Sequence, residues 1–252
     1  MQTLIAAALC FVLAAGQGQT PEGGARKIDS FGDIPDSDWL ARLDHFAVRL
    51  QNAPGSQGYV VASYVRHKLP GWPLRRVNWA VGYLVETRGI PHDRLSIING
   101  GFADDITYEL WLVEAGAELP VKPFDPSLMM SGEKNPLLFD RFFIYGPRYE
   151  YEVNYETYLS LKGRYEPFAT VLNSDPGLRG CVIAYMKGRQ RRGTDRRLAA
   201  RIKRQLTSEH AVDVSRVAAL AGGRREVMTV ELWLVPPGSP LPKPSPANTR
   251  RR

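Results

Sequence analysis

The chain has 252 residues, of which 44% are hydrophobic and 23% charged, and its formal net charge is +7. This composition supplies enough apolar surface for one large or two small globular domains and excludes a disordered chain or a fibre. Its cysteines are Cys10 and Cys181 alone, which excludes a disulfide-rich scaffold and a zinc site built from several thiolates. The positive charge predicts an anionic partner or none.

An uncharged apolar run begins the chain and stops at Gly16. It holds about thirteen apolar residues, whereas a helix that spans a bilayer needs about 20. The run is therefore typical of an export signal, which we place within residues 1–18, and the small residues Ala14 and Gly16 offer a cleavage point before Gln17. A lipoprotein signal is the competing interpretation, but Leu9 precedes Cys10, where a small residue would be needed. We expect a secreted or periplasmic bacterial protein with no transmembrane segment after cleavage.

The sequence contains an internal repeat, in which residues 42–120 align without a gap on residues 164–242 at an offset of 122. Of the 79 aligned positions, 24 are identical, which is about 30% where composition alone would give roughly 6%. The longest identical stretch is ELWLV, at 109–113 and again at 231–235. The repeat predicts a tandem duplication, and therefore two copies of one domain.

In the first copy, residues 27–31 predict a short strand, and the capping residues 36–38 precede a helix whose apolar side chains recur at helical spacing up to Leu50. Pro54 and Gly55 end that helix. The copy then continues with a strand at 58–64, a helix from Pro73 to Gly89, a strand at 95–98, a turn at Gly100 and Gly101, and a strand at 107–113.

The second copy repeats this order, with strands expected at 138–142, 180–186, 214–220 and 228–235, and helices at 158–172 and 194–206. About eleven residues are inserted after its first strand, in a tyrosine-rich stretch at 142–158. We predict an α+β protein made of two tandem β-α-β-α-β-β sandwiches, each with its helices on one face of a mixed sheet. The domains span 27–119 and 138–235, a proline-rich linker spans 120–137, and the proline-rich basic tail 236–252 should be extended and mobile.

Each copy resembles the OmpA-like domain over about 85 residues. The resemblance rests on an early Asp between apolar residues, then RRVNWAVGYL at 75–84, RGI at 88–90 and DRL at 93–95 before a glycine-rich turn. It implies a sheet with two helices on one face, in an envelope protein that binds the peptide stem of peptidoglycan.

In that family an Asp after the second strand and an Arg early in the second helix hold the charged end of a diaminopimelate residue. A zwitterion needs both groups, because one accepts from its ammonium and the other donates to its carboxylate. The resemblance places the Arg at Arg76 in the first copy, whereas Leu198 stands there in the second. The loops 65–72 and 187–193 contain no carboxylate, and Asp195 is placed to cap a helix. We therefore expect a degenerate, repurposed form of the family's site.

The strongest local bias is basic, since residues 187–204 include nine Lys or Arg and one acid, Asp195. Leu198, Ile202 and Leu206 recur at i, i+4 and i+8 and should face the core, so the arginines should face solvent. This face is either a solvated helix surface or a patch for an anionic polymer or lipid headgroup. Nucleic acid is not expected, because the segment has no aromatic residue. The candidate ligand-binding residues are Arg76, Arg191, Arg192, Arg196, Arg197 and Arg201.

Enzymatic chemistry has little support, since the four histidines share no metal-ligand spacing and no nucleophile-elbow, Walker A or dinucleotide motif is present. A role in the core explains Cys181, and repetition of a strand explains Glu109 and Glu231. We predict no enzyme, no metal and no cofactor, but a non-catalytic cell-envelope module that contacts peptidoglycan or another anionic envelope polymer. The alternative is a protein-interaction scaffold with no glycan ligand, which would use the tyrosine-rich insert and the tail.

Overall fold

The computed structural model describes residues 24–144, 155–188 and 190–245, with only the backbone for 155–163. The expected export signal at 1–18, the middle of the tyrosine-rich insert and the end of the tail lie outside these ranges. The first half contains β1 (Ala25–Phe31), α1 (Asp36–Gln51), β2 (Ser56–Tyr64), α2 (Gly71–Glu86), β3 (Leu95–Phe102) and β4 (Thr107–Glu114). The second half contains β5 (Leu137–Ile144), α3 (Tyr155–Ser174), β6 (Arg179–Lys187), α4 (Thr194–Glu209), β7 (Val217–Arg225) and β8 (Met228–Val235).

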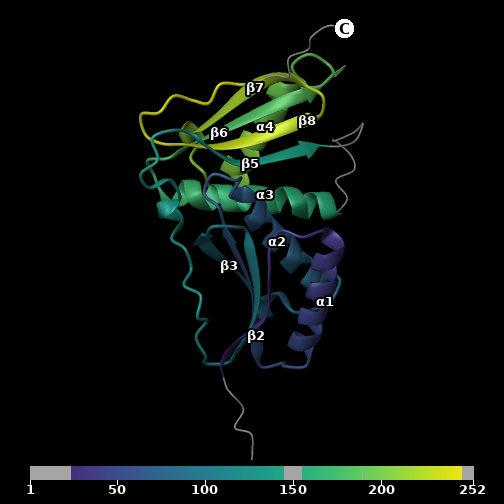
Figure 1. Cartoon of the computed structure of the whole chain (residues 1–252). Helices are drawn as coiled ribbons and strands as arrows, with labels where there is room; N and C mark the ends of the chain where they lie inside the picture. The colour runs from purple at the N-terminus through teal and green to yellow at the C-terminus, as the bar shows by residue number, and fades with distance from the viewer. Residues whose placement is uncertain (1–23, 145–154, 189, 246–252) are drawn as a thin grey trace, which may run out of the picture.

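Each half forms one four-stranded sheet, in the order β1-β4-β2-β3 and β5-β8-β6-β7 (Figure 1). In each sheet the second and third strands of the half pair in parallel and the other pairs are antiparallel. The halves share the strand register as well, since Trp111 lies opposite Tyr59 and its counterpart Trp233 lies opposite Cys181. The prediction of an α+β protein with two similar halves is confirmed.

The predicted turn at Gly100 and Gly101 is wrong, because both residues lie inside β3. The register between β2 and β3 shifts from Ala62 opposite Asn99 to Ser63 opposite Gly101, so Gly100 is the extra residue of a β-bulge. Gly101 has a φ of 82°, which favours glycine. The bulge keeps the edge strand paired over its whole length while the chain bends.

Several other boundaries also differ from the prediction, most clearly those of β7 and α2. The strand β7 starts at Val217 and runs to Arg225, because the residues before it form the 3-10 helix η3 (Val214–Arg216). The helix α2 starts at Gly71, two residues before the Pro that was expected to begin it, and ends at Glu86. A similar 3-10 helix, η1 (His92–Arg94), precedes β3 in the first half.

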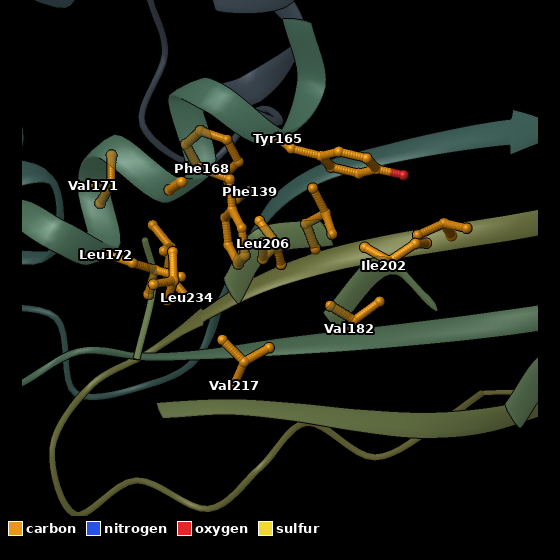
Figure 2. Close-up of a cluster of buried hydrophobic side chains, with 14 of the residues drawn as sticks. Phe139, Tyr165, Phe168, Val171, Leu172, Val182, Ile202, Leu206, Val217 and Leu234 are labelled. Atoms are coloured by element: carbon orange, nitrogen blue, oxygen red, sulfur yellow. The ribbon is translucent and has the colours of Figure 1, made fainter. Parts of the chain in front are cut away.

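The helices bury their apolar stripes against the sheets. In α1 the side chains of Trp39, Leu43, Phe46 and Leu50 are fully buried. Phe168 in α3, the counterpart of Phe46, is likewise buried, and Figure 2 shows it with Leu172 and Phe139 in the core of the second half. The equal burial of this repeated pair agrees with the expectation that the duplication preserved the core.

The two halves pack through their helices, with α3 lying between α2 and the second sheet (Figure 1). Leu74 in α2 is buried in the core of the second half, and so is Tyr64 at the end of β2. The backbone of Gly71 approaches the side chains of Phe139 and Asp140 in β5. The first half therefore completes the core of the second.

The segment predicted to be a linker contributes to that core. Residues of this segment form the 3-10 helix η2 (Pro126–Met130), and Met129 and Met130 are buried in the second half. The described part of the tail, 236–245, contains a turn at Pro237 and Gly238 but no helix or strand, and it packs on the protein: Ser239 is buried and Leu241 is half-buried. The prediction that this part of the tail is mobile is wrong, because it covers an apolar face of the second sheet.

Replacing Gly71 by alanine should weaken the contact between the halves. A Cβ atom on Gly71 would lie 2.7 Å from the ring of Phe139 and 2.8 Å from the Cβ of Asp140, and both side chains are fully buried. We expect the free energy of unfolding in urea to fall by about 1–3 kcal/mol, as is typical of overpacking. Gly55→Ala is the control, since no atom lies within 4 Å of its added Cβ. Equal stability of both variants would contradict the close approach.

Candidate functional site

Arg76, which the resemblance assigns to a ligand, already has partners within the chain. Its guanidinium donates to the carboxylate of Asp36, at the start of α1, and to the carbonyl oxygen of Ile34 at 3.0 Å. The residue is only 9% exposed. Arg76 therefore ties α2 to the start of α1, and little of its side chain faces solvent.

Three tryptophans surround the same guanidinium. Its central carbon lies 5.2 Å from the ring centroid of Trp39, 5.5 Å from that of Trp72 and 6.0 Å from that of Trp79. Such contacts are attractive because the face of an aromatic ring carries negative charge. Trp39 is fully buried, whereas Trp72 and Trp79 are half-buried, so the cluster reaches the surface beside the exposed carboxylate of Asp36.

No pattern in the sequence predicts the pairing of Asp36 with Arg76. The resemblance places a carboxylate in the loop after the second strand of each copy, whereas Asp36 lies 40 residues before Arg76 in sequence. Asp36 was expected to help cap α1, but the N-cap position is Pro35, with no side-chain capping bond. The carboxylate of Asp36 binds Arg76 instead, while its place in the first turn still suits the helix dipole.

The described residues of the second half form no equivalent cluster. Leu198 occupies the position of Arg76 and is buried in the core of that half. One oxygen of Asp195 accepts from the backbone N–H of Arg196 at 2.9 Å, and the other accepts from the N–H of Gly223 in β7 at 3.0 Å. Asp195 thus joins α4 to β7 and is unavailable to a ligand.

The arginines of α4 lie on its solvent side, opposite the buried Leu198, Ile202 and Leu206. This arrangement matches the sequence prediction, and the loop before the helix adds two further exposed arginines. We call the following exposed residues the basic surface: Arg191, Arg192, Arg196, Arg197, Arg201 and Arg204. The structure therefore brings five of the six candidate residues together and places Arg76 elsewhere, in the first half.

The basic surface has no counter-charge within the described ranges. No ion pair joins any of its six arginines to a carboxylate, and Arg197 donates to the hydroxyl of Thr194 at 3.2 Å. By contrast, Arg42 lies 2.6 Å from Asp29, and Arg88 binds Asp44 through two nitrogens at 2.6 and 2.5 Å. Like charges that gather without partners repel one another, so an anion that binds there relieves the repulsion.

One repeated arginine has a structural role in both halves. Arg94 donates to three backbone carbonyl oxygens, those of Leu50, Ala53 and Ser56, at 2.7–3.2 Å. Arg216 donates to the three equivalent carbonyl oxygens in the second half, those of Leu172, Asp175 and Leu178, at 2.7–3.4 Å. Each guanidinium satisfies acceptors at the end of a helix, which explains its identity in the two copies.

A second repeated pair changes its environment between the halves. Asp29 pairs with Arg42 near the surface, and its counterpart Asp140 is fully buried, 3.9 Å from Arg164 and 3.5 Å from Arg75 of the other half. Burial raises the pKa of Asp140, although both guanidiniums oppose that effect. Burial also lowers the pKa of Arg164 to about 10. The three charges form the polar centre of the contact between the halves.

The repeated glutamates accept from the tryptophan two residues later in each copy. Trp111 donates its indole N–H to Glu109 at 2.8 Å, and Trp233 donates to Glu231 at 3.2 Å. Glu231 is 2% exposed and also accepts from Arg141 at 3.1 Å and Arg225 at 3.0 Å. The glutamates are thus held in structural networks rather than presented to a ligand.

Cys181 is fully buried in β6, and burial raises its thiol pKa to about 12. The described residues contain no group of His, Cys, Asp and Glu suited to a metal ion. Within the same ranges, none of the helices is long and apolar enough to cross a membrane. No protein-family model matches the chain, and no curated protein matches it. The geometry therefore carries the argument about function.

Replacing Arg76 by alanine should destabilise the first half. The variant leaves the carbonyl oxygen of Ile34 without its donor and removes the cation from between three tryptophan rings. We expect the free energy of unfolding to fall by about 1–3 kcal/mol, measured in urea. Asp36→Ala should cost less, because its side chain is 75% exposed. Equal stability of Arg76→Ala and the parent chain would contradict the structural role of Arg76.

Proposed function

We propose that the protein is a non-catalytic cell-envelope module that binds an anionic envelope polymer through the basic surface of α4. The observation that carries this proposal is the gathering of six exposed arginines with no carboxylate partner in the described ranges. Electrostatic binding of this kind depends on neutralising several anionic groups at once and on releasing their counterions. Teichoic-type polymers and anionic glycan strands present such groups at regular intervals.

The comparison of α4 with α2 supports a binding role for this surface. Leu74 in α2 is buried against the second half, and its counterpart in α4 is the exposed Arg196. Gly71, where α2 approaches β5, corresponds to Gly193 at the start of α4. The face that α2 uses to contact its neighbour is therefore open and basic on α4, so a flat polyanion has access to it.

The resemblance to OmpA-like domains supports an envelope location and agrees with the two helices packed against each sheet. It favours peptidoglycan as one candidate polymer. In our proposal Arg76 does not make the contact, because Asp36 and the carbonyl oxygen of Ile34 already hold its guanidinium. The interaction is instead one of charge with a repeating anion, and it needs no pocket.

The test is binding to purified sacculi and to a teichoic-type polymer over a range of salt concentrations. Replacing Arg191, Arg192, Arg196 and Arg197 by glutamine leaves Leu198 and the rest of the buried stripe intact, so the fold should be kept. We expect weaker binding at low salt, and a slope of log affinity against log salt that is smaller by about 3, since four contacts are removed.

The matched control removes the same charge from scattered sites. Arg26, Arg49, Lys68 and Lys122 are exposed residues of the first half and of the segment that follows it. Their replacement by glutamine lowers the net charge equally but leaves the basic surface unchanged. Equal loss of binding in both variants would show a response to net charge alone, and unchanged binding in the α4 variant would overturn the proposal.

A further inference from the structure

The outer face of the second sheet carries a small apolar cluster that the tail covers. Cys181, Ile183, Tyr185 and Val235 form this cluster, and all four are fully buried. The helices pack against the opposite face, where a Cβ atom on Gly180 would meet Leu172 and Phe168. Leu241 packs on the cluster, and Figure 1 shows the yellow end of the chain running along the side of the sheet away from α3.

Polar contacts hold residues 236–245, here called the strap, along its length. The hydroxyl of Ser239 donates to the carbonyl oxygen of Lys134 at 2.6 Å, and Arg179 donates to the carbonyl oxygen of Ser239. At the far end, Arg225 donates to the carbonyl oxygen of Ser245 at 3.1 and 3.2 Å. The strap contains no helix or strand, so its release would break no pairing between strands.

The buried carboxylate of Glu231 holds Arg225 and Tyr185, the two residues that bind the end of the strap. Glu231 accepts from Arg225 at 3.0 Å and from the hydroxyl of Tyr185 at 3.1 Å. The guanidinium of Arg225 lies 3.4 Å from the ring centroid of Tyr185, whose oxygen accepts from the N–H of Ser245 at 3.1 Å. The first half has Ser63 and Ala103 at the positions of Tyr185 and Arg225, so the residues that make these contacts are present in the second half alone.

The proline-rich sequence of the strap suits the apolar sheet face that it covers. Its sequence, PPGSPLPKPS, contains five prolines, which favour an extended chain with few backbone donors to satisfy. Recognition of such chains relies on aromatic rings and a few donors aimed at carbonyl oxygens. The outer face offers the rings of Tyr185 and Trp233, an apolar seat for Leu241 and the guanidinium of Arg225.

We propose that the outer face of the second sheet is a binding site for proline-rich peptide segments, which the strap occupies within the same chain. A segment of a partner protein that has a Leu between prolines competes with Leu241 for its place on the apolar cluster. The site is separate from the basic surface and is independent of the function proposed for it. It gives the protein an exchangeable contact with a proline-rich chain.

Cys181 reports on this site, because it is buried in the apolar cluster on which Leu241 packs, and we expect release of the strap to raise its reactivity with a thiol reagent. The experiment uses the full chain with Cys10→Ser, so that Cys181 is the one thiol. Leu241→Asp should raise the modification rate of Cys181 about tenfold, since a charge in the apolar seat favours local opening. Adding the synthetic peptide PPGSPLPKPS in excess should return the rate towards that of the parent, whereas PPGSPDPKPS should not.

Leu119→Asp is the matched control, since Leu119 lies at the position of Leu241 in the first half, and it should leave the rate unchanged. An unchanged rate in folded Leu241→Asp would overturn the proposal, and so would a raised rate that the peptide does not reverse. Ser239→Ala removes one bond of the strap and no apolar contact. It should raise the rate by a smaller factor, and it serves as the test if Leu241→Asp fails to fold.

Discussion

The contact between the two halves depends on Asp140, a carboxylate that has lost all exposure to water. An isolated buried charge would be costly, and here Arg164 from the same half and Arg75 from the other half surround it. The equivalent Asp29 and Arg42 form a pair near the surface of the first half. The pair therefore occurs in both halves, and where its second copy is buried, Arg75 in α2 adds a third charge. Separating the halves would leave that carboxylate with one cation fewer.

Because of this contact, equivalent helices of the two similar copies have different surroundings. The helix α2 packs against α3, whereas its counterpart α4 packs on its own sheet and presents its other side to solvent. The residues have diverged accordingly: Leu74 is buried in α2 where Arg196 is exposed in α4, and Val171 is buried in α3 where Arg49 is exposed in α1. The outer helices α1 and α4 thus each carry an exposed arginine where α3 and α2 bury an apolar side chain. The same charges make the surface of α4 available to an anion.

The outer faces of the sheets have diverged in a similar way. In the first half, the segment after β4 continues into the second half, and the N–H of Phe124 donates to the carbonyl oxygen of Asn99 in the edge strand. In the second half, the segment after β8 lies across the sheet as the strap. Arg225 and Tyr185 stand at positions where the first half has small residues, and they join Glu231 to the strap. The segment after the last strand therefore leads into the other half in the first copy and covers the sheet in the second.

The sequence by itself determined the repeat, the order of strands and helices, and which side of α4 faces the core, because these depend on local periodicity and on identity between the copies. It also indicated that the family's Asp is missing from both loops. It did not reveal that Asp36 binds Arg76, that Asp140 gathers arginines from both halves, or that the tail covers Cys181. These contacts join residues far apart in the chain, and only tertiary packing decides which groups meet and which are removed from water. Gly100 and Gly101 in β3 show the same limit. Their sequence predicts a turn, but β3 pairs with β2 both before and after Gly100, so the pair lies inside the strand at a bulge.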